Sequence, residues 1–219
     1  MSRSKPREIA DHVRELIVTG QVVPDSFLRL DLLAADLNSS VTPVREALIQ
    51  LATEGFLEQY PRRGFKVLPI TDQDLADVYA AQSWLSGELA ARAVRTMSRR
   101  DLDGLERLQV ELEAAAARGA ADEVERCNHG FHRTINVAAE VPRLAVLLKL
   151  TSRYAPRLFF ANVSGWPEAS ATDHRQVIVA LRAGDPDAAR EAMSAHVRRA
   201  GELLVAHRAR GAGVGVAPS

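Results

Sequence analysis

Apolar side chains in the first 55 residues recur at helical spacing in three stretches. The apolar positions of the first two stretches are Ile9, Val13, Leu16, Ile17, Leu33 and Leu37. Gly20 marks the expected end of the first helix, because glycine readily adopts the left-handed conformation that follows many helices. A tight turn over residues 38–40 leads into the third stretch. The pattern therefore predicts three short helices joined by turns.

The third helix has a clear start signal. The hydroxyl of Thr42 is suited to cap its first turn, and Pro43 is suited to the first helical position, where no amide hydrogen is needed. Its buried face should be formed by Val44, Leu48 and Leu51. Gly55 should end it, and Arg45 lies in its first turn, directed off the buried face. A helix that enters the major groove with its N-terminal residues forward reads DNA in helix-turn-helix proteins.

Two short runs, residues 56–60 and 65–68, flank a Pro-Arg-Arg-Gly turn and predict a β-hairpin. Three helices followed by a hairpin describe a winged helix. Arg62 and Arg63 at the tip of the wing would then contact phosphates or the minor groove, which positions a protein on DNA more than it selects a sequence. The alternative is that both arginines belong to a solvated turn.

Helical spacing continues from residue 71 to about residue 209, with no convincing strand, and predicts six helices. Thr71 should start the first of them in a capping box with Asp74. Ser170 should cap the fifth, with Asp173 three residues on. The expected helix starting at Pro142 should kink or end at Pro156.

The fold class predicted from these patterns is mainly α. Residues 1–70 should form a winged helix-turn-helix of three helices and a hairpin, and residues 71–209 an all-α antiparallel helical bundle. Residues 210–219, rich in Gly and Ala, should form a disordered tail.

Composition narrows the class of protein only a little. The 28 Lys and Arg side chains balance 28 Asp and Glu, so bulk charge neither supports nor excludes a nucleic-acid partner. The single cysteine, Cys127, excludes an internal disulfide and fits a reducing compartment. No signal peptide is visible, and no apolar run approaches the roughly 20 residues needed to cross a bilayer. We expect a cytoplasmic protein with no membrane partner.

Three histidines occupy inward positions of three different bundle helices. They are His132, His174 and His196, and Asn128 lies four residues before the first of them on the same helix face. Facing helices build metal sites in bundle cores, and three buried imidazoles are hard to accommodate without partners. Ligation by imidazole without thiolate suits Zn²⁺, Ni²⁺ or a similar divalent ion. A polar ligand pocket or separate core histidines is the alternative. His12, His129 and His207 should lie on the surface.

The string from Thr42 to Leu48, Thr-Pro-Val-Arg-Glu-Ala-Leu, followed at this distance by Arg63-Gly64-Phe-Lys-Val67, resembles the DNA-binding domain of GntR-type transcriptional regulators over residues 12–67. The resemblance implies binding to double-stranded operator DNA. The implied DNA-binding residues are Thr42, Arg45, Arg62, Arg63 and Gly64. Three positions depart from the family pattern: Asp25 replaces a usual Gly, Leu30 a usual Glu, and Val41 an arginine that family members commonly direct at DNA.

The remainder resembles the FCD domain, the all-helical ligand-binding domain of the FadR-type branch of this family. The matching strings are Asn128-His-Gly-Phe131-His132, Asp173-His174-Arg-Gln-Val-Ile178, Gly184-Asp185, Ala188 and His196. The resemblance implies that Asn128 and the three histidines ligate a divalent metal ion. An Asp is usual at position 128, so the neutral amide should weaken the site.

The same resemblance concerns the effector, which in this branch is often held by an arginine near position 82. Gln82 stands there in this chain, which argues against a simple carboxylate effector. Arg153 and Arg157 could pair with a carboxylate instead, but the interpretation of both as solvated charges is favoured.

The leading hypothesis is a homodimeric transcriptional regulator, most often a repressor in this family, that binds a metabolite beside a metal. An enzyme that uses a three-histidine metal to activate water is the competing class. We find no His-Glu-x-x-His helix and no carboxylate placed as a base, which argues against it. A third hypothesis is a regulator whose metal is structural or absent.

Overall fold

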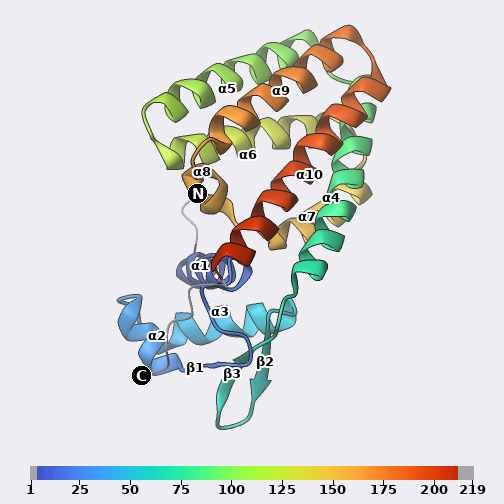
Figure 1. Ribbon diagram of the computed structural model, residues 1–219. Coiled ribbons are helices and arrows are strands. Elements are labelled where there is room, and N and C mark those ends of the chain that lie inside the picture. Colours follow the sequence, from blue (N-terminus) through green and yellow to red (C-terminus); the bar gives the residue numbers. More distant parts are fainter. Residues whose placement is uncertain (1–3, 212–219) are drawn as a thin grey trace. The chain divides into compact units, whose positions relative to one another are not determined.

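The computed structural model describes residues 4–211, which form two compact units (Figure 1). The first unit takes in the chain up to Asp74 together with the chain from Ala206, and the second is Leu75–Val205. The elements of the first unit are α1 (Lys5–Val18), β1 (Phe27–Leu28), α2 (Leu30–Asp36), α3 (Val41–Thr53), β2 (Leu57–Tyr60) and β3 (Gly64–Val67).

The first unit is a winged helix, as the sequence predicted. Helix α3 packs against α1 and α2, and the strands form an antiparallel sheet in the order β1-β3-β2. Its fully buried side chains include Val13, Val44, Leu48, Leu51, Phe56 and Phe65. The strand β1 was not predicted. It is two residues long, and only its pairing with β3, where Phe27 lies opposite Lys66, defines it as a strand.

The start of α3 differs from the prediction. Ser40, with φ −84° and ψ 161°, is the N-cap, and the helix begins at Val41, so the predicted cap at Thr42 is wrong. Pro43 therefore occupies the third helical position. It is tolerated there because the first amide groups of a helix have no acceptor within it. Gly20 and Gly55 adopt the expected left-handed conformation after α1 and α3, with φ of 78° and 85°.

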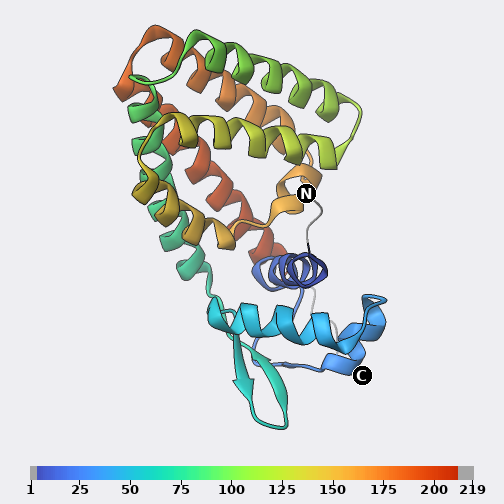
Figure 2. The same cartoon turned by 180° about the vertical axis from the view of Figure 1, so that it is seen from behind.

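The second unit is an all-helical bundle, and together with the winged helix it confirms the predicted fold class (Figure 2). Its elements are α4 (Asp72–Ala93), α5 (Arg99–Ala117), α6 (Ala121–Ala138), α7 (Pro142–Thr151), the 3₁₀ turn η1 (Ser152–Tyr154), α8 (Arg157–Asn162), α9 (Trp166–Ala183) and α10 (Pro186–Gly211). Helix α5 packs on both α6 and α9. None of the helices in residues 4–211 is long and apolar enough to span a membrane.

Two helix boundaries of the bundle depart from expectation. Helix α7 ends at Thr151, before Pro156, and the short α8 follows it. Helix α9 begins at Trp166, after Gly165 in the left-handed conformation, so the predicted cap at Ser170 is wrong. Pro167 next to this start explains the earlier boundary, because proline suits the first positions of a helix. The capping box at Thr71 is present, since the Asp74 amide donates to Thr71 Oγ1 at 3.0 Å.

Helix α10 extends to Gly211 and so includes the first two residues of the predicted tail. Residues 212–219, the rest of that prediction, lie outside the described residues.

Helices α4 and α10 pack closely through small residues. Ser83 Oγ donates to the carbonyl oxygen of Ser194, and Ser194 Oγ donates back to the carbonyl oxygen of Ser83. A methyl group added at Gly87 would meet Ser194 Oγ and would lie 2.9 Å from the carbonyl oxygen of Arg190. Glycine at this position therefore sets how near the two helices approach.

Candidate metal centre and DNA-reading surface

The three predicted histidines converge in the second unit and are called the histidine cluster below. His132 comes from α6, His174 from α9 and His196 from α10. Their ligand nitrogens lie within 4.8 Å of one another, and His132 Nε2 is 3.3 Å from His196 Nε2. The ring of Phe131 stacks on His174 with centroids 3.9 Å apart and fixes the plane of that imidazole.

His132 and His174 present lone pairs rather than charges. Burial, with smaller contributions from His196 and His129, lowers the pKa of His132 to about 3. Burial, and then His196 and His132, lowers the pKa of His174 well below its usual value. Both imidazoles are therefore neutral near pH 7, the form in which histidine binds metals.

Two buried polar atoms among the predicted ligands lack a hydrogen-bond partner within the described residues, His174 Nε2 and Asn128 Oδ1. Such orphaned atoms are costly in a folded protein. Asn128 lies one turn before His132 on α6, as the sequence predicted. A divalent ion bound by three imidazole nitrogens and an amide oxygen would satisfy them, so the residues present fit the predicted metal.

Two chains of hydrogen bonds lead away from the histidine cluster. In the first, called the Gln109 relay, His174 Nδ1 lies 3.1 Å from Gln109 Oε1, and Gln109 Nε2 donates to Glu113 at 2.9 Å. Arg175 Nε donates to the same Glu113 oxygen at 2.7 Å. In the second chain of hydrogen bonds, called the Asp173 relay, His196 Nδ1 lies 3.3 Å from Asp173 Oδ2.

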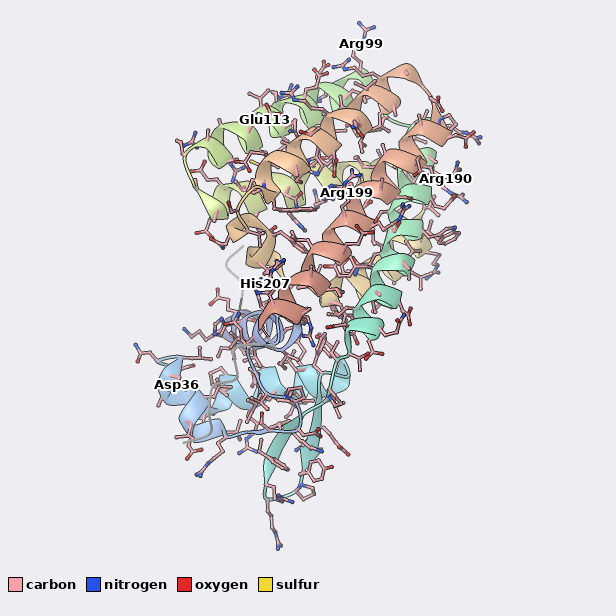
Figure 3. All side chains as sticks on the ribbon, in the orientation of Figure 1. Asp36, Arg99, Glu113, Arg190, Arg199 and His207 are labelled. Atoms are coloured by element: carbon pink, nitrogen blue, oxygen red, sulfur yellow. The ribbon has the colours of Figure 1, made fainter. Side chains whose placement is uncertain are left out.

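Arg199 completes the Asp173 relay, with Nε donating to Oδ2 at 2.9 Å and a second guanidinium nitrogen pairing with Oδ1. Glu113 on α5 and Arg199 on α10 are labelled in Figure 3, on the helices that flank α9.

Sequence reasoning missed both relays. The signal for Gln109 was a polar residue in the inward stripe of α5 between Leu105 and Leu112, all of them buried. Asp173 was interpreted as a capping partner of Ser170, whereas it lies inside α9 and is buried. Its position directly before His174 gave no indication that its partner is His196.

The three predicted effector residues come from different elements, α4, η1 and α8. Gln82 is buried, and its Nε2 donates to the carbonyl oxygen of Thr151 at 3.0 Å, which ties α4 to α7. Arg153 lies in η1 and is partly exposed. Arg157 begins α8, and its side chain lies outside the described part of the chain. Their role in effector binding stays a prediction.

One face of α3 is available to DNA. Val41, Thr42 and Arg45 are exposed, whereas Val44 and Leu48 are fully buried. The exposed residues therefore belong to the N-terminal half of the helix, the part that contacts base edges in a helix-turn-helix. Val41 places an apolar side chain at the start of this exposed face.

The two wing arginines differ in their surroundings. Arg62 has φ +64° at the tip of the hairpin, seen below α3 in Figure 1. The guanidinium of Arg63 lies over the ring of Phe27, 4.6 Å from its centroid, and so packs on β1. Gly64 has φ +99°, and a methyl group there would lie 2.9 Å from the carbonyl oxygen of Leu28. The structure thus explains Gly64 by backbone packing.

Residues 5–67 match the family of bacterial regulatory proteins called gntR, and residues 77–199 match the FCD domain. The chain belongs to the GntR family. Members of this family with an FCD domain are transcription regulators, so the predicted class, a DNA-binding regulator and not an enzyme, is confirmed.

Relatives of this GntR regulator match it over most of their length. It is 28% identical over 194 residues to a Paenarthrobacter nicotinovorans protein named "Probable D-xylose utilization operon transcriptional repressor", covering 86% of this chain and 85% of that protein. It is 25% identical over 192 residues to the transcriptional regulator McbR of Escherichia coli, covering 85% and 86%. The solved structure of McbR superimposes with a TM-score of 0.70 at 23% identity over 93% of this chain and 98% of that one, which shows a common fold.

Proposed function

We propose that this GntR regulator binds operator DNA as a homodimer and represses transcription until a small-molecule effector binds its FCD domain beside a divalent metal ion. The convergence of three histidine nitrogens, with the orphaned atoms His174 Nε2 and Asn128 Oδ1, carries this proposal. A regulator without a metal would have no need to bring these lone pairs together.

The donor set indicates which ions would bind. All four ligands would be neutral in the bound state, because Asn128 supplies an amide oxygen and histidine ligates metals as the neutral imidazole. Nitrogen-rich sites favour Zn²⁺ and Ni²⁺ over Mg²⁺ or Ca²⁺. A divalent ion held by these neutral donors would keep its full charge, which favours an anionic group on the effector.

Exposed apolar side chains support the homodimer. Trp84 on α4 and three residues of α7 are large, apolar and exposed. The residues of α7 are Val146, Leu147 and Leu150. The two helices are linked by the hydrogen bond from Gln82 to Thr151. Apolar faces of this kind commonly mark interfaces, and a second copy of the chain would cover them. Paired winged helices would then read two half-sites whose spacing the effector alters.

Metal analysis of the full chain tests the proposal. Purified protein, dialysed against a chelator and titrated with Zn²⁺ and with Ni²⁺, should bind about one ion per chain, as seen by calorimetry and elemental analysis. The changes His132→Ala, His174→Ala and His196→Ala should each abolish tight binding, whereas His12→Ala in the first unit should leave it intact. A wild-type protein that binds neither ion would refute the metal, and unchanged binding in all three variants would refute the site.

A further inference from the structure

The orientation of Gln109 follows from its neighbours. Its Nε2 group donates to the carbonyl oxygen of Ala171 at 3.1 Å and to Glu113 Oε1 at 2.9 Å. A carbonyl oxygen only accepts hydrogen bonds. Arg175 lowers the pKa of Glu113, so this carboxylate is ionised and also only accepts. The amide of Gln109 therefore cannot be turned round, and its Oε1 faces His174.

The tautomer of His174 follows in turn. Gln109 Oε1 can only accept, and it lies 3.1 Å from His174 Nδ1. His174 must therefore carry its hydrogen on Nδ1 and donate it to Gln109. Its Nε2 is then unprotonated. This is the buried atom that has no hydrogen-bond partner among the described residues.

Asp173 fixes a hydrogen on His196 Nδ1. Arg199 pairs with both carboxyl oxygens of Asp173, with Nε donating to Oδ2 at 2.9 Å, so the group is a carboxylate. A carboxylate only accepts, and its Oδ2 lies 3.3 Å from His196 Nδ1. His196 therefore donates from Nδ1, and its Nε2 lies on the side of the ring that faces His132, 3.3 Å from His132 Nε2.

We propose that Gln109 and Asp173 are positioning residues that accept hydrogen bonds from Nδ1 of His174 and Nδ1 of His196, so that Nε2 of each ring is left for a divalent ion before it arrives. This inference rests on the proposed metal function, and hydrogen-bonded second neighbours of this kind tune metal affinity in general.

The tautomers can be observed directly. Two-bond ¹H–¹⁵N spectra of the metal-free full chain, labelled at histidine, should show a hydrogen on Nδ1 of both His174 and His196. Addition of Zn²⁺ should leave these two hydrogens in place. A metal-free spectrum in which Nδ1 of His174 or of His196 carries no hydrogen would overturn the proposal.

Substitutions in the relays give a second readout. Gln109→Leu should randomise the tautomer of His174 alone, and Asp173→Asn should disturb His196 alone. Each should lower Zn²⁺ affinity about 10- to 100-fold in competition with a chromophoric chelator. Arg182→Gln is the matched control, because Arg182 also joins α9 to α5 through Asp103 and Glu106 but belongs to neither relay. Its affinity should be unchanged.

The outcomes distinguish the metal function from the positioning role of the two relays. Wild-type protein that binds neither Zn²⁺ nor Ni²⁺ would refute the metal function, while its metal-free tautomers would still decide the relays. Wild-type affinity in both relay variants would refute the positioning role although metal binds. If either substitution changed the ring signals of all three histidines equally, the cause would be a loss of structure. That result would contradict the claim that each relay acts on one histidine.

Discussion

At the scale of single residues, Arg62 and Arg63 are neighbours with different surroundings. Arg63 stacks on Phe27, which also meets Tyr60 edge-on with ring centroids 5.5 Å apart. A guanidinium held over an aromatic ring at an exposed site contributes about 0.5–1 kcal/mol. Arg62 stands at the tip of the wing in a left-handed conformation. We therefore expect Arg62 to contact DNA and Arg63 to stabilise the first unit.

We predict that Arg62→Gln makes operator binding less dependent on salt, reducing the slope of log affinity against log salt by about 1, because one phosphate contact is lost. Arg63→Gln should instead lower the stability of the first unit by about 0.5–1 kcal/mol. Fluorescence anisotropy at several salt concentrations and chemical denaturation measure the two effects. The proposed division is wrong if both variants change the slope equally and neither changes stability.

The neutral histidines predict a pH dependence for the metal-free protein. The unfolded chain protonates His132 with a pKa of about 6.5, whereas the folded chain does so with a pKa of about 3. Between these values the unfolded state binds more protons, so stability is full above pH 6.5 and falls as the pH is lowered toward 3. The slope for this residue approaches 1.4 kcal/mol per pH unit. His174 adds a loss of the same sign.

Urea denaturation at about pH 7, 6 and 5 in the presence of a chelator measures this loss, and pH values above 5 keep it apart from most carboxylate titration. His132→Gln should flatten part of the slope, whereas His12→Ala should preserve it. A wild-type profile that stays level from pH 7 to 5 would contradict the assignment of neutral, buried imidazoles.

At the scale of elements, the approach of α4 to α10 depends on glycine. Gly87→Ala should destabilise the second unit by about 1–3 kcal/mol, because the added methyl group meets the backbone of α10 at Arg190 and forces the helices apart. Gly104→Ala in α5 is the control, since a methyl group there meets only Arg107 at 3.7 Å.

Replacing glycine by alanine in the exposed interior of a helix raises the free energy of unfolding by up to about 1 kcal/mol. Thermal unfolding should therefore move in opposite directions for the two variants. A shift of the same sign in both would show that the spacing of α4 and α10 does not matter.

The helix boundaries also show which features can be predicted from residues close together in the sequence. The ends of α1 and α3 were predicted because a left-handed glycine is a property of one residue and its neighbours. The starts of α3 and α9 were not, since Ser40 and Thr42 both suit a cap, as do Gly165 and Ser170. Which member of such a pair caps the helix depends on how the preceding turn packs, and that is decided by the rest of the fold.

At the scale of the whole molecule, the apolar faces of α4 and α7 predict the assembly. Leu147→Glu should convert a dimer to monomers in analytical ultracentrifugation, weakening association by about 2 kcal/mol or more, because a charge would be buried at the interface. Operator affinity should fall with it. Val179→Glu, at an exposed site on α9, is the control and should change neither property. If the Leu147→Glu protein remained dimeric, the interface would lie on other elements than α4 and α7.

The periodicity of the chain by itself determined the helices, the wing and the three histidines that face inward, because apolar faces, caps and turns arise from residues near one another in sequence. Only the tertiary structure decided what surrounds those histidines. Gln109 and His174 are 65 positions apart, and Asp173 and His196 are 23 apart on different helices. Their contacts depend on how α5, α9 and α10 pack, and hydrogen-bond partners across helices leave no periodic trace in the sequence.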